Sequence, residues 1–250
     1  MHFRFGEGMS TPSWCRRHGE KPAYSYDPPI EYASNDAAPA DADRPGLLVV
    51  ISGPSGVGKS TIVERLGQAW PFEFSVSATT RPPRPGEEAG TDYQFVNQAV
   101  FNVMVETDQF LEWAEYAGNL YGTPRRPVLS ALAEGRNVLL GIEVKGAVQV
   151  MDGYNQVVTI FIMPPSIEEL EQRLRGRDDT DDTAIKGRMA VVEMEMAVGR
   201  DRFQHRVVNE SVEAAIGQIV GILERESASY AGESSARAPH IIDPQGDDAA

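Results

Sequence analysis

Residues Gly53 to Ser60 read GPSGVGKS, a glycine followed by four residues and then Gly-Lys-Ser. Before them stands LLVVIS, Leu47 to Ser52, an apolar and β-branched stretch of strand length. After them, in TIVERLGQAW at residues 61–70, apolar side chains recur at helical spacing. A strand, a glycine loop and a helix in this order can hold phosphate, because backbone N–H groups and the helix N-terminus converge on the anion. We therefore predict a nucleotide site, with Lys59 on the β- and γ-phosphates and Ser60 on Mg²⁺.

Composition narrows the class of protein. The chain has 250 residues, of which 41% are hydrophobic, enough for one medium-sized domain with tails. Its net charge of −14 argues against general affinity for nucleic acid or an anionic membrane. No stretch reaches the ~18 apolar residues of a membrane span, and the N-terminus lacks the apolar core of a secretory signal. The single cysteine, Cys15, excludes an intramolecular disulfide and fits a cytoplasmic protein.

The ends of the chain differ in composition from its middle. Residues 1–44 are rich in Pro, Ala and Asp without periodicity, and we expect a disordered N-terminal extension. Residues 227–250 are rich in small, polar and acidic side chains, and we expect a disordered tail. The domain is expected over residues 45–226.

The second half of this domain alternates strands and helices. Apolar strand candidates lie at 137–143, 157–163 and 206–209, and helical patterns at 127–133, 167–175 and 184–198. Such alternation is typical of an α/β protein with a parallel sheet covered on both faces. Residues 72–122 break the rhythm, because FEFSVSATT, YQFV and FLEWAEY are strand-like pieces joined by polar turns. We expect a small mixed or antiparallel insert there, and a core of residues 45–71 and 123–226.

The insert carries two candidate features for a second substrate. Arg81 and Arg84 lie in a loop stiffened by three prolines, where they either clamp a phosphate or remain solvated on the surface. Ser77 and Tyr93 would add neutral donors. Glu112 stands in the apolar run FLEWAEY, where it either faces water or is buried against a base. A carboxylate can accept from both N1–H and N2–H₂ of guanine, a pair that adenine lacks.

Together these stretches resemble the guanylate kinase family, enzymes that convert ATP and GMP into ADP and GDP. The resemblance runs from about Leu47 to Leu223 and rests on GPSGVGKST, SVSATTRPPRPGE, DYQFV, FLEWAEYAGNLYGTP, IFIMPPSIEELEQRLRGR and VVN. It implies the three-layer α/β fold of the P-loop NTPases, with a parallel central sheet, a GMP-binding insert and a helical lid at about 173–188. It also implies ATP and GMP as substrates, Mg²⁺ as cofactor and a role in purine nucleotide metabolism in the cytoplasm.

The resemblance also assigns site residues by position. The implied ATP ligands are Gly53, Pro54, Ser55, Gly56, Val57, Gly58, Lys59, Ser60, Thr61 and Asn209, with Ser60 also on the metal. The implied GMP ligands are Ser77, Arg81, Arg84, Tyr93 and Tyr121 at the phosphate and Glu112, Thr123 and Glu143 at the base, with Glu87 bracing the arginine loop. The implied catalytic residues are Lys59, Arg81, Arg177 and Arg188, which would neutralise charge during transfer. The arginines at 177 and 188 alternatively pair with nearby aspartates on a helix surface.

One position departs from the family, and two alternative functions stay open. Gly141 stands where relatives of the family usually place an acidic residue, so we predict that Glu143 or a water chain compensates and that the Mg²⁺ requirement is higher. The first alternative is a guanylate kinase-like binding module with weakened catalysis, against which the intact Lys59 and Ser60 count. The second is a P-loop kinase for another small phosphate acceptor, against which Glu112 and the paired arginines count.

Overall fold

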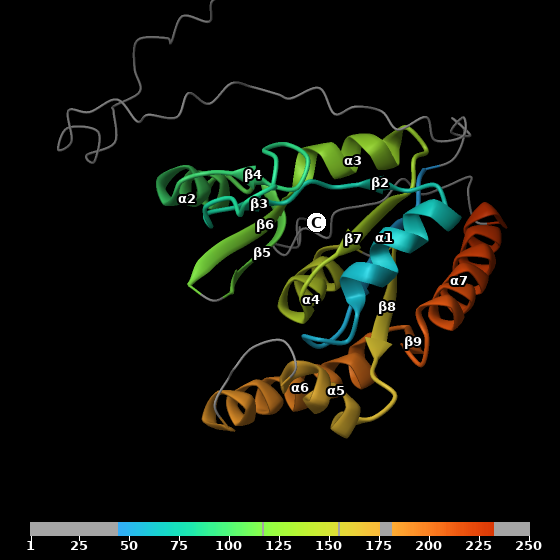
Figure 1. Ribbon diagram of the computed structural model, residues 1–250. Helices are drawn as coiled ribbons and strands as arrows, with labels where there is room; N and C mark the ends of the chain where they lie inside the picture. The colour runs from blue at the N-terminus through green and yellow to red at the C-terminus, as the bar shows by residue number, and fades with distance from the viewer. Residues whose placement is uncertain (1–44, 117, 155, 176–181, 233–250) are drawn as a thin grey trace, which may run out of the picture. The chain divides into compact units, whose positions relative to one another are not determined.

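The computed structural model describes residues 45–116, 118–154, 156–175 and 182–232 (Figure 1). The predicted extension at 1–44, residue Arg177 and the end of the predicted tail from 233 lie outside these ranges. Within the described ranges the chain forms nine strands and seven helices. None of the helices so described is both long and apolar enough to cross a lipid bilayer.

Five strands form the central sheet, in the order β2-β7-β1-β8-β9. Every neighbouring pair in it runs parallel. Buried apolar side chains dominate its central strands, as expected for a parallel sheet covered on both faces. The strands are β1 (Leu48–Ser52), β2 (Glu73–Phe74), β7 (Val138–Gly141), β8 (Val157–Met163) and β9 (His205–Val208).

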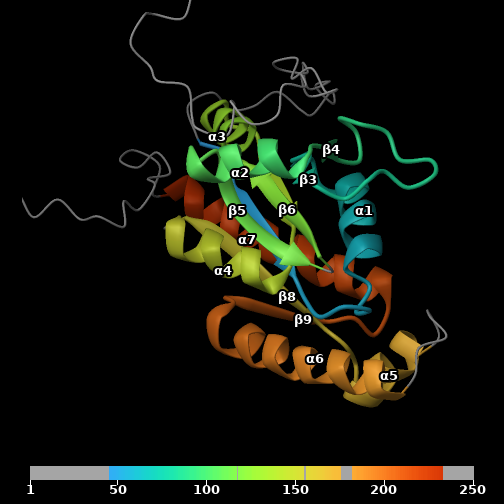
Figure 2. The same cartoon turned by 90° about the vertical axis from the view of Figure 1, so that its left-hand side faces the viewer.

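Helices form a layer on each side of this sheet, which gives the three-layer α/β fold that the resemblance implies (Figures 1 and 2). On one side α1 (Lys59–Ala69) packs against α7 (Val212–Gly232). On the other side α4 (Val144–Gly153) packs against β1, β8 and α6 (Asp182–Arg202). Two further helices complete the layers, α3 (Arg125–Ala133) against β7 and α5 (Ile167–Arg175) against α6.

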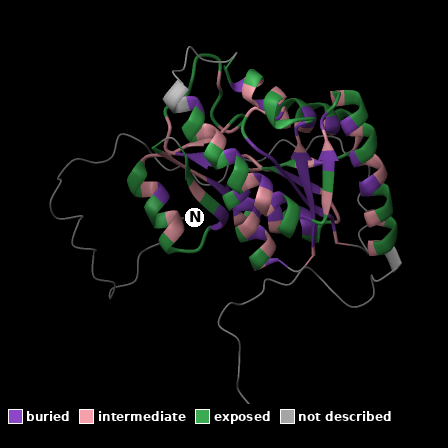
Figure 3. Cartoon of the chain, turned by 90° about the horizontal axis from the view of Figure 1, so that it is seen from below, coloured by how far each residue is buried: buried purple, intermediate pink, exposed green. Residues whose placement is uncertain are grey.

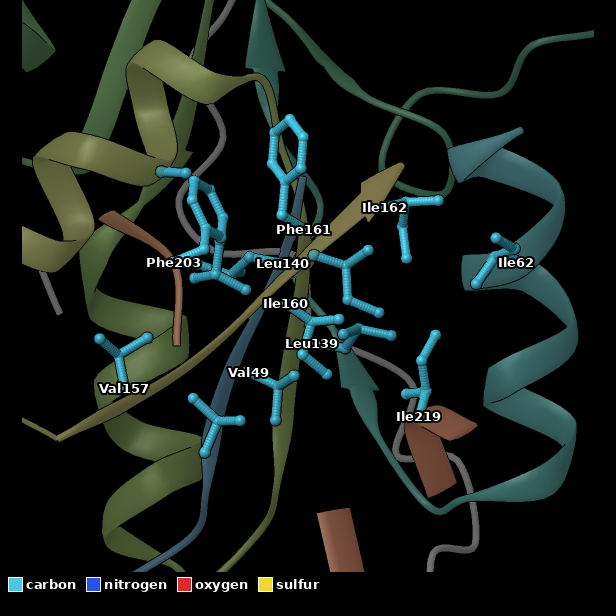
Figure 4. Close-up of a cluster of buried hydrophobic side chains, with 14 of the residues drawn as sticks. Val49, Ile62, Leu139, Leu140, Val157, Ile160, Phe161, Ile162, Phe203 and Ile219 are labelled. Carbon is cyan, nitrogen blue, oxygen red and sulfur yellow. The ribbon is translucent and has the colours of Figure 1, made fainter. Parts of the chain in front are cut away.

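The main core lies between these layers. Seen from below, the strands are largely buried, and the helices are buried only along their inner faces (Figure 3). Ile62 of α1 and Ile219 of α7 approach β8 from one side, and Phe203, just after α6, lies on the other (Figure 4). The rings of Phe161 and Phe203 are 5.1 Å apart between centroids. This packing holds the C-terminal ends of β1 and β8 firmly, where the glycine loop begins.

The insert forms a second sheet, in the order β4-β3-β6-β5. It is mixed, because β3 and β4 run parallel whereas the other pairs run antiparallel. One helix covers it, and the ring of Phe101 on this helix stacks on Phe110 with centroids 4.6 Å apart. The elements are β3 (Ala78–Thr79), β4 (Gln94–Phe95), α2 (Gln98–Glu106), β5 (Phe110–Tyr116) and β6 (Asn119–Pro124).

The structure differs from the sequence-based expectation in several elements. The stretch FEFSVSATT is divided, because β2 pairs with β7 of the central sheet whereas β3 pairs with β6 of the insert. Helix α2 was not predicted, because its β-branched valines are typical of strands. It begins after Asn97, whose side chain accepts the Val100 N–H at 2.9 Å as an N-cap. Helix α7 continues to Gly232, within the stretch predicted as a tail, and the Tyr230 hydroxyl donates to Gln156 at 2.6 Å.

Candidate active site

The glycine loop joins β1 to α1. Gly58 is in the left-handed region, with φ at 96°, and α1 begins at the next residue. A Cβ on Gly58 would lie 2.7 Å from Nδ2 of Asn209, so a larger residue would collide there. The N–H groups in the first turn of α1 have no partner within their own helix, and the helix dipole adds positive potential. This end of α1 is therefore suited to bind an anion.

Asn209, directly after β9, is hydrogen-bonded to this loop. Its Nδ2 donates to the Val57 carbonyl at 2.8 Å, and its backbone N–H donates to the Met163 carbonyl at 2.8 Å. The residue is 4% exposed. The amide of Asn209 thus holds the shape of the loop, and its implied role as an ATP ligand stays a prediction.

Lys59 is the first residue of α1, and its ammonium group already has two partners. Its Nζ donates to the Ile142 carbonyl at 3.0 Å and lies 3.0 Å from Oε1 of Glu143. The strand predicted over 137–143 ends at Gly141, and Glu143 is the N-cap residue of α4. The carboxylate implied for the base of GMP therefore lies beside the lysine of the glycine loop in this structure.

The arginine loop of the insert is organised around Glu87. Nη2 of Arg81 donates to Oε1 of Glu87 at 2.8 Å, and the backbone N–H of Arg84 donates to Oε2 at 2.7 Å. The hydrogen bond from Arg81 lowers the pKa of Glu87. The guanidinium carbon of Arg81 lies 5.4 Å from the centre of the Tyr93 ring. Glu87 thus fixes Arg81 and the backbone at Arg84, while the Arg84 side chain stays exposed.

Tyr93 and Tyr121 stand next to this arginine. Their rings meet edge to face, with centroids 6.0 Å apart. Burial raises the pKa of Tyr93, so its hydroxyl stays protonated at neutral pH and can donate a hydrogen bond. The pKa of Arg81 is raised mainly by its hydrogen bond to Glu87 and further by one to Tyr121. Arg81, Tyr93 and Tyr121 therefore form one group of donors on the insert.

Glu112 and Thr123 face each other across β5 and β6. The Thr123 hydroxyl donates to Oε1 of Glu112 at 2.5 Å. Glu112 is only 6% exposed, and burial raises its pKa although the bond from Thr123 opposes the shift. A carboxyl group buried in this way, with one oxygen already occupied, has strong demand for a further donor. The N–H groups along the edge of a nucleotide base could supply this donor.

Helix α4 joins the insert site to the glycine loop. A Cβ on Gly146 of α4 would collide with the Glu112 carboxylate, so the absence of a side chain there makes room for it. Gln149, one turn further, accepts the Trp113 N–H at 3.2 Å and donates to the Trp113 carbonyl at 2.8 Å. The charges of Glu143 and Lys59 also act on the pKa of Glu112. The two sites are thus adjacent and share one helix.

The remaining residues predicted for the site lie at the following positions. Ser60 and Thr61 are exposed in the first turn of α1, and Ser77 contributes its carbonyl to the Gln94 N–H at 2.9 Å. Arg188 is half-buried on α6, and Arg177 lies outside the described residues. Gly141 is exposed at the end of β7, where a Cβ would lie 3.1 Å from Cγ2 of Val63.

One residue beside the glycine loop was not predicted. Glu195 of α6 is half-buried, and burial raises its pKa to about 7. Glu143 adds to this shift, whereas Lys59, Lys145 and a hydrogen bond from the Ser55 backbone N–H oppose it. Its position seven residues after Arg188, on the same helix face, is the signal that the sequence offered.

Comparisons with known proteins identify the family. A family model described as guanylate kinase matches residues 46–226. A guanylate kinase of Thermosynechococcus vestitus is 49% identical over 174 residues, which is 69% of this chain and 91% of the relative. A guanylate kinase of Anaeromyxobacter dehalogenans is 42% identical over 212 residues, which is 84% of this chain and 93% of the relative. The crystal structure of guanylate kinase from Anaplasma phagocytophilum matches with a TM-score of 0.60 and 34% identity, covering 73% of this chain and 87% of that one. The chain therefore belongs to the guanylate kinase family.

Proposed function

We propose that this chain is a guanylate kinase, which transfers the γ-phosphoryl group of ATP to GMP and yields ADP and GDP. One observation carries the proposal beyond family membership. The buried carboxyl of Glu112 packs on α4 at Gly146, and the N-cap residue of the same helix, Glu143, pairs with Lys59. The carboxyl that would recognise guanine, Glu112, and the lysine that would bind phosphate, Lys59, therefore both lie at the same end of one helix. Direct transfer between two nucleotides requires such neighbouring sites.

ATP would bind with its phosphates on the glycine loop. The N–H groups from Gly53 to Thr61 and the positive end of α1 would hold the β- and γ-phosphates. Lys59 would shift from Glu143 toward the phosphate oxygens and neutralise their charge. Asn209 would support this site indirectly, because its amide fixes Val57.

GMP would bind on the insert. Glu112 and Thr123 would read the guanine edge, and Glu143 would join them once Lys59 has turned to ATP. The phosphate of GMP would meet Arg81, which Glu87 already orients, and the arginine at 84, which is exposed and able to move. The further phosphate ligands of this proposal are Ser77, Tyr93 and Tyr121.

Mg²⁺ is the proposed cofactor, and the residues present fit it with few protein ligands. The exposed Ser60 hydroxyl is an oxygen donor beside the loop, and the Glu143 carboxylate is 48% exposed. Mg²⁺ commonly takes one or two protein oxygens and completes its shell with phosphate and water. When bound, it would neutralise charge on the β- and γ-phosphates. Arg188 on α6, together with Arg177, would add positive charge from the lid.

The proposed domain is residues 45–232, because α7 continues beyond the predicted boundary at 226 to Gly232. Its insert runs from β3 to β6, since β2 within the predicted range of 72–122 pairs with the central sheet. The rest forms the core, with a lid near 173–188. We place the enzyme in the cytoplasm, where its nucleotide substrates and a single free cysteine are both expected.

ATP consumption should be measured with GMP, dGMP, AMP, CMP and UMP as acceptors, for the full chain and for Lys59→Ala. We expect turnover with GMP and dGMP, at least 100-fold slower turnover with the others, and no detectable turnover for the variant. Absence of turnover with every acceptor would favour a binding module. A preference for a base without the N2 amine would favour the other kinase reading.

The consequence of Gly141 for Mg²⁺ is tested by Gly141→Asp. A carboxylate at this strand end should lower the Mg²⁺ concentration that gives half-maximal rate. ATP binding measured by calorimetry with and without Mg²⁺ should show the same difference between the variant and the natural chain. Identical Mg²⁺ dependence in both measurements would end this hypothesis.

A further inference from the structure

Strand β5 carries Glu112 and lies at the edge of the insert sheet. It pairs with β6 on one side, and no strand in the described part of the chain pairs with its other side. An uncovered strand edge leaves its backbone N–H and carbonyl groups to water or to another partner. At Trp113, directly after Glu112, these groups have a partner that is not a strand.

That partner is the side chain of Gln149 on α4. Its Oε1 accepts the Trp113 N–H at 3.2 Å, and its Nε2 donates to the Trp113 carbonyl at 2.8 Å. A primary amide carries both an acceptor and donors, so it can pair with the two backbone groups of one residue as a neighbouring strand would. Gln149 therefore takes the place of a further strand at this one residue.

A second side chain fixes β5 on the other side of Glu112. Arg125, the first residue of α3, donates through Nε and Nη2 to the Phe110 carbonyl, at 3.2 Å and 3.0 Å. It also binds the two carboxylate oxygens of Asp108, at 2.5 Å and 2.8 Å. The pairing of β5 with β6 is irregular between Phe110 and Glu112. The irregular stretch that carries Glu112 thus lies between two anchors, Arg125 before it and Gln149 after it.

The position of Glu112 relative to α4 is narrowly defined. Gly146 and Gln149 are three residues apart and so lie on the same side of this helix. A Cβ on Gly146 would collide with the Glu112 carboxylate, so this carboxylate lies close to the backbone of α4. The N-cap residue of α4, Glu143, is 3.0 Å from Nζ of Lys59. A shift of β5 away from α4 would therefore change the distance between the proposed guanine and phosphate sites.

We propose that Gln149 is a positioning residue for GMP, which holds β5 against α4 and so sets where Glu112 meets the guanine edge. This inference rests on the proposed function. Arg125 alone would leave β5 fixed on only one side of Glu112, and the strand would be free to pivot there. Both bonds of Gln149 join neutral groups, so the property that matters is an acceptor and a donor held side by side.

Gln149→Met keeps the length of the side chain and removes both hydrogen-bonding groups. We expect kcat/KM for GMP to fall by about 10-fold, because two hydrogen bonds that hold the base site are lost. ATP affinity, measured by calorimetry, should not change, since the glycine loop lies on other elements. Hydrogen exchange of the Trp113 amide should accelerate, whereas the amides of β6 should keep their rates.

The matched control is Gln218→Met, because Gln218 is exposed on α7, on the other side of the central sheet. Equal GMP kinetics in Gln149→Met and Gln218→Met would overturn the inference. An equal loss of affinity for ATP and GMP would do so too, because it would indicate general damage. Urea unfolding of each full-length variant shows whether a loss of rate follows a loss of fold.

A cycle with Glu112→Gln tests whether Gln149 acts through the carboxyl group. If it does, adding Gln149→Met should lower kcat/KM for GMP by less than about twofold beyond Glu112→Gln alone. Additive losses would mean that Gln149 acts elsewhere, and the inference would fail. Failure of the proposed function itself would appear separately, as absence of GMP turnover in the natural chain.

Gln149→Glu provides a rescue that a general loss of structure would not show. An ionised carboxylate accepts the Trp113 N–H but has no donor for the Trp113 carbonyl, whereas a neutral carboxyl has both. The deficit in kcat/KM for GMP, relative to the natural chain, should therefore shrink as pH falls from about 8 to about 5, toward the ordinary glutamate pKa of about 4.3. Titration of the nucleotides and of Glu112 is common to both chains and cancels in the ratio. A deficit that stays constant, as expected for Gln149→Met, would contradict the pairing with Trp113.

Discussion

At the scale of single residues, Glu112 is the side chain that we propose selects the base. Its carboxyl is buried, one oxygen is bound to Thr123, and the space that it occupies exists because Gly146 has no side chain. A base that offers no pair of donors leaves this carboxyl unsatisfied, and an unsatisfied buried acceptor is costly. Selectivity at such a site comes mainly from rejection of the wrong base.

Glu112→Gln should therefore impair GMP use specifically. The amide replaces one acceptor by a donor, which would face the donors of guanine. We expect kcat/KM for GMP to fall by about 100-fold or more, with little change in KM for ATP. Steady-state rates with each substrate varied in turn would measure this. Glu115→Gln, at an exposed position of the same strand, is the control, and equal losses for both nucleotides would indicate general damage instead.

The titration of Glu195 should be visible in the pH dependence of the free energy of unfolding. Its pKa is about 7 in the folded chain, against 4.5 for an ordinary glutamate, so the folded state retains a proton that the unfolded state releases. The resulting stabilisation is complete below about pH 4.5 and is lost as pH rises to about 7 and above. Relative to Glu195→Gln, the free energy of unfolding of the natural chain should fall between pH 5 and 8. Parallel urea-unfolding curves for the two proteins across this range would refute the assignment.

At the scale of elements, the insert depends on one small cluster of its own. Ala78, Phe101 and Phe110 are buried together, apart from the main core. Phe101 is the one fully buried member from α2, and Met104 and Val105 of the same helix are only partly buried against the cluster. The insert should therefore loosen more easily than the central sheet.

Phe101→Ala should test this independence. Removal of a buried phenylalanine costs about 3–5 kcal/mol, and here the loss falls on the insert. We expect KM for GMP to rise at least 10-fold while ATP binding, measured by calorimetry, changes little. Hydrogen exchange should accelerate in β3 to β6 and stay unchanged in β1 and β8. Faster exchange throughout both sheets would mean that the insert and core unfold together.

The sequence predicted those elements whose secondary structure is determined by their own residues. β1 and β8 are buried on both faces and therefore read as continuous apolar runs, and α5 has a strong helical pattern. β2 is different, because two residues become a strand only through pairing with β7. Likewise, the loop, Arg81 and Glu112 could be located from motifs. The shared role of α4 could not, since it depends on how distant segments pack.

At the scale of the whole molecule, the end of α7 decides where the folded part stops. Tyr230 packs against the main core, and its hydroxyl donates to Gln156 near the start of β8. Residues to 232 therefore belong to the fold, although their small and polar composition is typical of a tail.

Two shortened chains test this boundary. A chain of residues 45–232 should keep the rate of the full chain, because the proposed substrate ligands all lie within it. A chain of residues 45–226 loses Tyr230 and the last turn of α7, and its free energy of unfolding should be lower by about 1–3 kcal/mol. Urea unfolding compares the two. Equal stability would return residues 227–232 to the tail, and loss of activity in both would give the terminal segments a part in catalysis.

The pairing of Lys59 with Glu143 has a consequence for how the phosphate site behaves in a solution that contains many small anions. An unpaired ammonium in an anion cradle would attract inorganic phosphate, sulfate or pyrophosphate, and such occupants would block the enzyme. With the carboxylate of Glu143 already 3.0 Å from its Nζ, the charge of Lys59 is partly neutralised before a nucleotide arrives. We therefore expect a small anion to compete poorly with this carboxylate for the lysine, whereas a nucleoside triphosphate, which would engage the loop and the lysine together, should compete better.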